Sequence, residues 1–472
     1  MPDVPLTITE AAEQLRSGAT TAVELLAAVT ARADAHDELL GAYITRFDDE
    51  ALEAAERADA ELAAGIDHGP LHGIPIGVKD ILAMAEGPTT AQSLILDPAW
   101  GAGKDAPVVT RLRAAGAVLT GKLTTMEFAC GAPDPDKPFP LPRNPWNTDT
   151  WTGGSSSGTG AGVAAGMFLA GVGTDTGGSI RIPAIFCGVS GLMPTFGRVP
   201  KSGCAPLGYS LDHIGPLARS TRDCAYFLQA IAGPDPTDPY TVDRPVPDFL
   251  ENANGSLEGV RIGVERANHF PDDTDPAVVA QFEASLAVLE ELGATLVDVE
   301  IPHYQEVVAA MLVTCMSEAF AYHRNDLQER WGDFFRTTRV AVASGALFSG
   351  ADYVQAQRVR RVGQRGLAGL FQEVDLIVSP AASKGAPTYD ELLVADPLSV
   401  LDRVHTAYWD AVGNPALVVP MGFDDGGLPL SLQIAARPFE EALLVQAGDA
   451  FQQASDWHLR VPPLVSETPA AA

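Results

Sequence analysis

The 472-residue sequence has few cysteines, few basic side chains and no long apolar run, and each shortage excludes a class of protein. Its five cysteines include no Cys-x-x-Cys pair, and their spacing matches neither a disulfide framework nor a zinc site. Only 31 Lys and Arg stand against 61 Asp and Glu. The resulting net charge of −30 would repel phosphate backbones and anionic membrane surfaces, so we expect neither a nucleic-acid nor a membrane partner.

No segment has the roughly 18 consecutive apolar residues that a membrane span needs, and the first residues lack the basic-then-apolar pattern of a secretory signal. The sequence is nevertheless rich in core-forming residues, because 46% are hydrophobic and 19% are charged. No Ser/Gly-rich or charged linker divides it. We therefore expect one globular domain over residues 1–472, without a metal site, in a reducing, cytoplasmic compartment.

Hydrophobic periodicity predicts N-terminal helices over residues 1–65 and then an alternation of strands and helices. Thr21 and Glu24 form a capping-box pattern, and Asp48 begins an Ala/Glu-rich helix. Residues 304–371 are predicted to be mainly helical and to cover one face. Strands are predicted at 74–82, 117–121, 167–172, 260–264, 294–299, 376–378, 416–419 and 430–434, with helices at 108–115 and 275–292. This alternation indicates an α/β fold.

Lys79 lies in the predicted strand over residues 74–81, on the same face as Pro75, Gly77 and Ile81. Its neighbours are therefore small or apolar. A lysine that loses water has a pKa below its usual value of about 10.4, which makes the neutral amine available as a base. The alternative interpretation is a surface lysine on an edge strand.

Residues 152–162, TGGSSSGTGAG, are too rich in Gly and Ser to predict an ordinary helix or strand. A flexible linker is one interpretation and a phosphate-binding loop is another, although no strand precedes the segment and the chain has no GK[ST]. The third is the nucleophile elbow of α/β-hydrolases, with Ser156 as nucleophile and Asp410 and His458 as partners. That motif requires a preceding hydrophobic strand, whereas the sequence there is a Pro/Asn-rich loop.

Residues 172–181, VGTDTGGSIR, follow an apolar strand and put two glycines immediately before Ser179. Such glycines let successive backbone N–H groups turn toward one point and form an anion-binding nest. A nest of this kind would suit the oxyanion of an acyl-transfer intermediate, and Ser179 beside it is placed to attack. The alternative is a tight turn in which Ser179 caps a helix ahead of Pro183.

Together these segments resemble the amidase signature family. The matching stretches are PLHGIPIGVKDIL (70–82), GKLTTMEFACG (121–131), RNPWNTDTWTGGSSSG (143–158), GVGTDTGGSIRIPAIFCGVSGLMPT (171–195), LDHIGPLARSTRD (211–223) and GNPALVVPMG (413–422). The resemblance implies an amidase signature fold, in which a central mixed β-sheet is surrounded by helices and residues 70–235 form the signature core. It also implies site residues: Lys79 as base, Ser155 as a relay in a cis peptide, Ser179 as nucleophile, and the backbone N–H groups of Thr176, Gly177, Gly178 and Ser179 as oxyanion hole.

The implied activity is that of a serine amidohydrolase that forms an acyl-enzyme on Ser179 and needs no metal or organic cofactor. Cys130 lies where the family's acyl-pocket segment runs, so Cys130 and Ser155 are predicted to contact the substrate; a buried apolar thiol is the alternative for Cys130. We expect a stand-alone enzyme for small or aryl amides, with esters and carbamates as further substrates. The alternative is the glutamine-hydrolysing component of a tRNA-dependent amidotransferase, which works only within a partner complex. Whether the chain forms a homodimer is left open.

Three positions depart from the family pattern. Ser157 replaces a glycine and Thr159 replaces a serine in the loop that holds Ser155, and Thr125 replaces the more usual Asn just before Met126.

Overall fold

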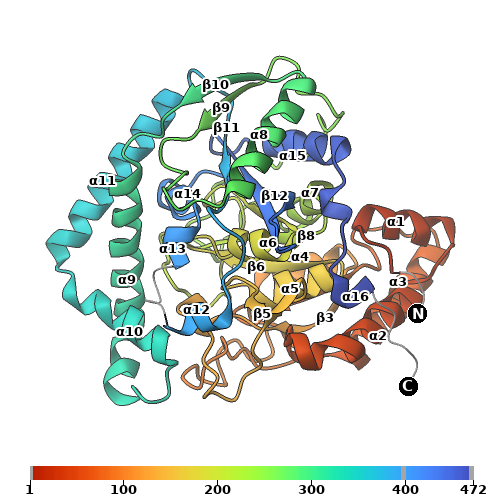
Figure 1. The fold of residues 1–472 in the computed structure, drawn as a ribbon. Helices are drawn as coiled ribbons and strands as arrows, with labels where there is room; N and C mark the ends of the chain where they lie inside the picture. Colours follow the sequence, from red (N-terminus) through yellow and green to blue (C-terminus); the bar gives the residue numbers. More distant parts are fainter. Residues whose placement is uncertain (1–3, 395–399, 467–472) are drawn as a thin grey trace.

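A computed structural model describes residues 4–394 and 400–466, and one 11-stranded sheet passes through the middle of it (Figure 1). Two groups of three strands within it are parallel, residues 75–79 with 118–123 and 170–175, and residues 261–265 with 295–299 and 376–380, and its other neighbouring pairs are antiparallel. The expected α/β fold with a central mixed sheet is confirmed. Across the sheet the order is β1 (Tyr43–Arg46), β3 (Val118–Leu123), β2 (Pro75–Lys79), β6 (Ala170–Asp175), β8 (His213–Ala218), β7 (Ser190–Met193), β12 (Ala416–Phe423), β13 (Pro429–Ala436), β11 (Leu376–Pro380), β9 (Arg261–Glu265) and β10 (Thr295–Val299).

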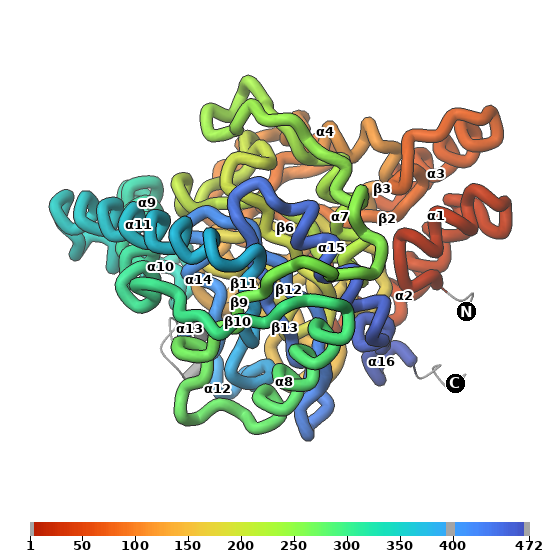
Figure 2. Tube along the Cα trace, turned by 90° about the horizontal axis from the view of Figure 1, so that it is seen from above, coloured from red at the N-terminus to blue at the C-terminus, as the bar shows by residue number. Residues whose placement is uncertain are grey.

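The N-terminal helices and the 304–371 segment lie on opposite sides of the sheet (Figures 1 and 2). The first group is α1 (Ile8–Ser17), α2 (Ala22–Leu40) and α3 (Asp48–Ala63), and Thr21 and Glu24 form the expected capping box on α2. The second group is α9 (Tyr304–Glu329), α10 (Arg336–Ser344) and α11 (Gly350–Leu370). Strand β1 interrupts the first group, which was expected to be helical throughout.

The remaining elements connect and cover the sheet strands. They are α4 (Pro107–Ala114), the small hairpin of β4 (Arg143–Asn144) and β5 (Asn147–Trp151), α5 (Ser157–Ala165), α6 (Arg181–Cys187), α7 (Thr221–Ile231), α8 (Pro276–Glu291), α12 (Tyr389–Val394), α13 (Val400–Arg403), α14 (Ala407–Val412), α15 (Glu441–Ala454) and α16 (Pro463–Ser466). No helix of the described residues is both long and apolar enough to cross a membrane.

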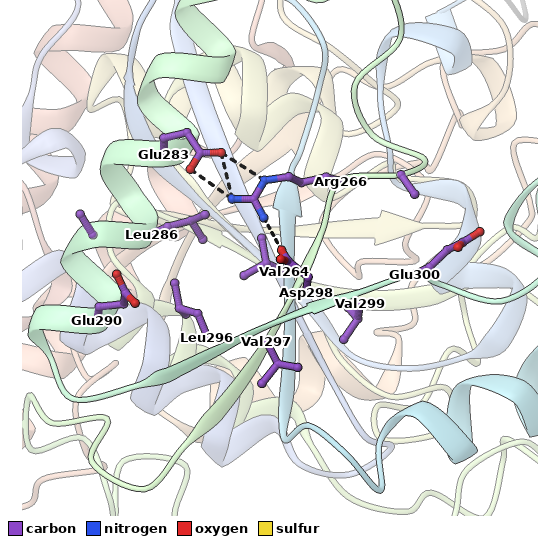
Figure 3. A pocket seen from close by; sticks show the side chains of 12 residues that line it. Val264, Arg266, Glu283, Leu286, Glu290, Leu296, Val297, Asp298, Val299 and Glu300 are labelled. Carbon is purple, nitrogen blue, oxygen red and sulfur yellow. Dashed lines mark hydrogen bonds and ion pairs between the residues drawn. The ribbon is translucent and has the colours of Figure 1, made fainter.

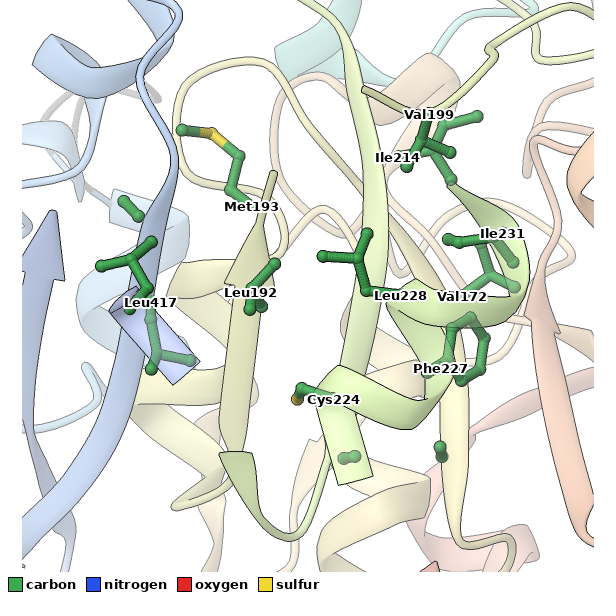
Figure 4. Packing of buried hydrophobic residues seen from close by; sticks show 14 of the residues in the cluster. Val172, Leu192, Met193, Val199, Ile214, Cys224, Phe227, Leu228, Ile231 and Leu417 are labelled. Atoms are coloured by element: carbon green, nitrogen blue, oxygen red, sulfur yellow. The ribbon is translucent and has the colours of Figure 1, made fainter. Parts of the chain in front are cut away.

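The centre of the core lies where α7 packs on the middle strands (Figure 4). Phe227, Leu228 and Ile231 of α7 are fully buried: Leu228 points toward Leu192 of β7, and Phe227 and Ile231 lie near Val172 of β6. Burying one side chain of this kind contributes about 1.5–3 kcal/mol. The same layer therefore fixes β6, β7 and β8, and it holds the end of β6 from which the turn around Ser179 departs.

The Gly/Ser-rich segment is partly a buried helix, so the flexible-linker interpretation is wrong, whereas no observation tests the phosphate-loop interpretation. Helix α5 covers Ser157–Ala165 and is buried at every residue. Its glycines allow this close packing: an added Cβ at Gly158 would lie 2.2 Å from the Ala42 carbonyl oxygen, and one at Gly162 would lie 2.2 Å from Phe168. Intrinsic preference disfavours glycine in a helix by about 1 kcal/mol per residue, and the packing overrides it here.

Strand β8 was also missed, because Gly215 and Pro216 interrupt its apolar pattern. Pro216 cannot donate a ladder hydrogen bond, which argues against a central strand. However, β7 pairs only with Leu217 and Ala218 of β8. Pro216 thus lies beyond the part of β8 that pairs with β7. The absence of a backbone N–H at Pro216 therefore leaves no β7 carbonyl without its ladder hydrogen bond.

Candidate active site

Lys79 and Ser155 are in direct contact inside the protein. The Lys79 amine nitrogen lies 2.8 Å from Ser155 Oγ and 2.7 Å from Thr174 Oγ1. Lys79 ends strand β2, between β3 and β6, and has no exposed surface. The surface-lysine interpretation is therefore wrong. Ser155 follows a cis Gly154–Ser155 peptide bond, the bond type that the resemblance implies.

Burial lowers the pKa of Lys79 to about 7, against the partial opposition of the nearby Cys204, Asp175 and Asp212. No carboxylate forms an ion pair with the Lys79 amine among the described residues; its two polar partners are hydroxyl groups. A neutral amine has two hydrogens and one lone pair. A bond donated to Thr174 thus leaves the lone pair of Lys79 available toward Ser155, which is the arrangement that a base requires.

Ser179 lies in a turn that follows strand β6, and its backbone is tied to the Ser155 loop by the Ser156 N–H, which donates to the Ser179 carbonyl at 3.2 Å. Ser179 does not cap a helix, because α6 begins later and its N-cap residue is Ile180. The capping interpretation is therefore wrong. Ser179 is 9% exposed and lines the same cavity as Ser155.

Three of the four backbone N–H groups expected in the oxyanion hole have no protein acceptor among the described residues, namely those of Thr176, Gly177 and Ser179. The fourth is directed elsewhere, since the Gly178 N–H donates to the Asp175 carboxylate. Gly178 has φ +132, a conformation that side-chain-bearing residues rarely adopt, and an added Cβ there would lie 2.2 Å from Thr406 Oγ1. The turn therefore needs glycine at this position.

A buried charge network lies behind the turn, and the sequence patterns did not reveal it. Asp175 accepts the N–H groups of Gly178 and Ile180 and forms an ion pair with Arg181 at 3.0 Å. Arg181 also reaches Asp410 at 2.5 Å and the Thr406 carbonyl at 2.9 Å. Burial alone would raise the pKa of Asp175, but Arg181 lowers it below its usual range, whereas burial and Asp175 raise the pKa of Asp410.

The contacts of Ser156 and of Asp410 argue against the nucleophile elbow at Ser156. The Ser156 hydroxyl is fully buried and exchanges hydrogen bonds only with the backbone of Thr174, at 3.2 and 3.3 Å. Asp410, the expected acid, pairs with Arg181 instead. Ser156 thus fixes the Ser155 loop to strand β6, and neither His458 nor any other histidine of the described residues contacts its hydroxyl.

A cavity of about 110 Å³ opens between the two serines and helix α9. Its polar wall is formed by Ser155, Ser179 and the backbone at Thr176 and Gly177. The rest of the wall is apolar and unusually rich in sulfur: Met126, Ala129, Cys130, Gly131, Trp151, Gly154, Ile182, Leu207, Met311, Leu312, Cys315, Met316 and Leu392. No charged side chain belongs to this wall in the part of the chain that the structure describes.

Cys130 lies in this wall and is buried, so it matches the buried-thiol alternative, and its contact with the substrate stays a prediction. Burial, with the negative charge of Glu127, raises the pKa of the Cys130 thiol to about 12. The thiol is therefore neutral and can act as an apolar contact, not as a nucleophile. No sequence pattern indicated Met311, Cys315 and Met316, which come from α9, about 180 residues beyond Cys130.

A larger hollow, of about 980 Å³, lies between α8 and the edge strand β10 (Figure 3). Its one basic side chain among the described lining residues, Arg266, is already paired with Glu283 at 3.0 Å and Asp298 at 2.6 Å. No Ser, Cys, Lys or His belongs to that lining. Size does not make this hollow a candidate for the same chemistry, because its described lining has no hydroxyl, thiol, amine or imidazole group and two of its carboxylates are already paired with Arg266.

Comparison with known proteins agrees with this geometry. A family model described as Amidase matches residues 24–445. The chain is 40% identical over 483 residues to a protein of Chloroflexus aggregans named as the A subunit of glutamyl-tRNA(Gln) amidotransferase, covering 97% of this chain and 98% of that protein. It is 38% identical over 469 residues to an amidase of Pseudomonas putida, with 98% of each chain covered. A solved structure, described as a vestigial protein complex that reveals the evolutionary origins of an s-triazine catabolic enzyme, matches with a TM-score of 0.89 at 34% identity, covering 95% of this chain and 98% of that one.

Proposed function

Because the chain belongs to the amidase family, a family of amidohydrolases, we propose that it hydrolyses small apolar or aryl amides through an acyl-enzyme on Ser179. The observation that carries this proposal is the hydrogen bond between Lys79 and Ser155 beside Ser179, at the polar end of an apolar cavity. A metal or organic cofactor has no part in the proposed reaction.

The proposed reaction moves one proton along two serines. Neutral Lys79 takes a proton from Ser155, Ser155 takes one from Ser179, and Ser179 Oγ forms a bond to the carbonyl carbon. The oxyanion accepts hydrogen bonds from the free N–H groups of the turn, where one lost donor typically costs about 10²–10³ in rate. The C–N bond then breaks as the relay returns the proton to the leaving amine, and water hydrolyses the acyl-enzyme by the same route.

The apolar cavity supports an uncharged acyl group. Methionine side chains adapt to irregular ligands and make favourable contacts with aromatic rings, and three of them line this cavity. An apolar cavity of about 150 Å³ holds benzene. The volume of about 110 Å³ therefore fits a short acyl chain, and a single ring fits with small movements of the methionines. Esters and carbamates present the same carbonyl and are proposed as further substrates.

The second candidate is the glutamine-hydrolysing component of a tRNA-dependent amidotransferase, because a relative 40% identical over almost its whole length is named as part of such an enzyme. Free glutamine carries an ammonium and a carboxylate group, and a site for it needs charged partners once water is excluded. The described cavity wall offers none. Because glutamine is charged and the cavity wall is not, uncharged amides are the preferred proposal.

The test compares ammonia or aniline release by the purified single chain from benzamide, acetanilide and glutamine, with Ser179→Ala as blank. Turnover of the anilide or benzamide by the chain alone supports the first candidate. Turnover of glutamine, restricted to the presence of amidotransferase partner proteins, would replace it with the second. Phenyl acetate and a phenyl carbamate, measured in parallel, rank the ester and carbamate activities.

A further inference from the structure

Two histidines and a glutamate converge at a site that the proposed hydrolysis does not use. Glu61 lies in the last turn of α3, and His68 and His72 lie in the loop that leads to strand β2. The ligand atoms that these three residues offer all lie within 4.8 Å of one another. His72 is fully buried, whereas Glu61 and His68 are about one-third exposed, so the cluster faces solvent on one side.

Two of the three separations between ligand atoms are close to those of a metal site, and the third is within 4.8 Å. A single oxygen, Glu61 Oε2, lies 3.2 Å from His68 Nε2 and 3.1 Å from His72 Nε2. Tetrahedral zinc with bonds of about 2.0–2.2 Å separates its ligand atoms by roughly 3.3–3.5 Å. Small side-chain movements would therefore let one ion replace the two hydrogen bonds that now converge on this oxygen.

The surroundings of His72 provide the support that a metal-binding imidazole usually has. Its ring packs closely against Gly116, where an added Cβ would lie 2.3 Å from the ring Cδ2 atom. On the far side of the ring, Asp67 Oδ1 lies 3.9 Å from Nδ1. Arg16 holds that carboxylate with hydrogen bonds of 2.8 and 2.9 Å. A carboxylate behind the second ring nitrogen is the usual partner of a zinc-bound histidine.

We propose that Glu61, His68 and His72 form a binding site for a divalent transition-metal ion of the zinc type. Two imidazoles and one carboxylate are a donor set that zinc takes, with water at the open fourth position. Metal binding at His72 Nε2 requires the proton on Nδ1. Nδ1 now accepts a hydrogen bond from the His68 N–H at 3.3 Å, so that bond must break, and Asp67 must close its 3.9 Å separation from Nδ1 to accept the proton.

The ion would join the end of α3 to the loop before β2. Lys79 lies at the opposite end of β2, so the ion is expected to stabilise this junction and to leave hydrolysis unchanged. The site is thus independent of the proposed function, and failure of one does not decide the other.

The test uses the full chain without a histidine tag, stripped with EDTA and titrated with Zn²⁺ in a calorimeter. We expect one ion per chain and a zinc-dependent rise in melting temperature, since a ligand of the folded state stabilises it. Glu61→Gln and His68→Gln keep the local shape and should each weaken binding by more than about tenfold, while Asp67→Asn should weaken it by about 10–100-fold. His303→Asn, at an exposed histidine outside the cluster, should change nothing.

Three results would overturn the proposal. The first is no zinc binding by the unaltered chain. The second is binding by His68→Gln or Glu61→Gln as tight as that of His303→Asn. The third is a thiolate charge-transfer band when Co²⁺ replaces Zn²⁺, because that band would place the ion on a cysteine.

Discussion

The turn that carries Ser179 and the cavity wall that faces it are held in opposite ways. The turn is fixed by charge-assisted hydrogen bonds from Asp175, Arg181 and Asp410, all fully buried. The facing wall consists of the side chains of Met311, Cys315 and Met316, which α9 presents and which have no polar partner in the described structure.

We expect this difference to separate catalysis from selectivity. Ionic hydrogen bonds are directional and expensive to break, so the turn has one shape. Thioether and thiol side chains repack at little expense, so the wall can change shape with its ligand. We therefore expect substitutions in the turn to abolish turnover of every substrate, and substitutions in the wall to change which substrate is preferred.

The largest effect is expected from Ser179→Ala, which removes the proposed nucleophile. Turnover of every amide should fall by about 10⁴-fold or more, because binding and the oxyanion donors alone retain little of the acceleration. Intact-mass spectrometry after exposure to a fluorophosphonate should show an adduct on the unaltered chain and none on the variant.

Ser156→Ala is the matched control, because it removes a neighbouring hydroxyl that binds only the backbone of Thr174. It should keep the adduct on Ser179 and lose about 1 kcal/mol of stability. An adduct that persists in Ser179→Ala and disappears in Ser156→Ala would make Ser156 the nucleophile.

The next effect is expected at Lys79, where Lys79→Met keeps the length and removes the amine. The rate of acylation should fall by about 10²–10⁴-fold. In the unaltered chain, kcat/KM should rise with pH around a midpoint of about 7, because the buried lysine must be neutral to act as base. That rising limb should be absent from the pH profile of the variant.

The same pKa has a consequence for stability. The pKa of Lys79 is about 7 in the folded chain, whereas the pKa of a lysine in the unfolded chain is 10.5. The unfolded state therefore binds more protons between these values, and stability should rise with pH across this window. Denaturant unfolding at pH 7 and pH 10 should show a smaller rise in Lys79→Met than in the unaltered chain; an equal rise would mean that Lys79 titrates like a lysine in water.

The features that could be predicted from the sequence are those that a short local pattern of residues determines. The apolar stretch around Lys79 favoured its burial, which is confirmed, and the glycines before Ser179 favoured a turn of unbonded N–H groups, of which all but that of Gly178 lack an acceptor among the described residues. Helix α5 was not predictable, because the contacts that favour glycine there come from Ala42, Phe168 and Pro183, which are distant in sequence from one another.

The cavity wall could not be predicted for a related reason. Its sulfur-bearing residues lie at 126–130 and at 311–316, and no periodicity indicates that α9 packs over the first segment. The charge network offered a faint signal, since Asp175 and Arg181 are opposite charges within a small, apolar stretch. Their third partner, Asp410, is 229 residues from Arg181, and only the fold brings it close.

A moderate effect is expected from Arg181→Lys, which keeps the charge and loses the planar group that bridges Asp175 and Asp410. One buried carboxylate is then left without its partner, which should lower stability by about 3 kcal/mol and lower kcat for all substrates together. Arg266→Lys, in the open hollow of Figure 3, is the control and should lose less than about 1 kcal/mol. Equal losses in urea unfolding of the two variants would show that the network does not fix the turn.

The smallest effect on overall activity, and the largest on selectivity, is expected at Cys315. Cys315→Leu fills part of the cavity and Cys315→Ala enlarges it, so the two changes should shift the preference between acetanilide and benzanilide in opposite directions. A difference of one or two methylene groups in an apolar pocket discriminates by about 10–100-fold. The measured quantity is the ratio of kcat/KM for the two anilides in each variant. If this ratio changes in the same direction in both variants, or in neither variant, α9 does not contact the acyl group. The wall would then be as rigid as the turn.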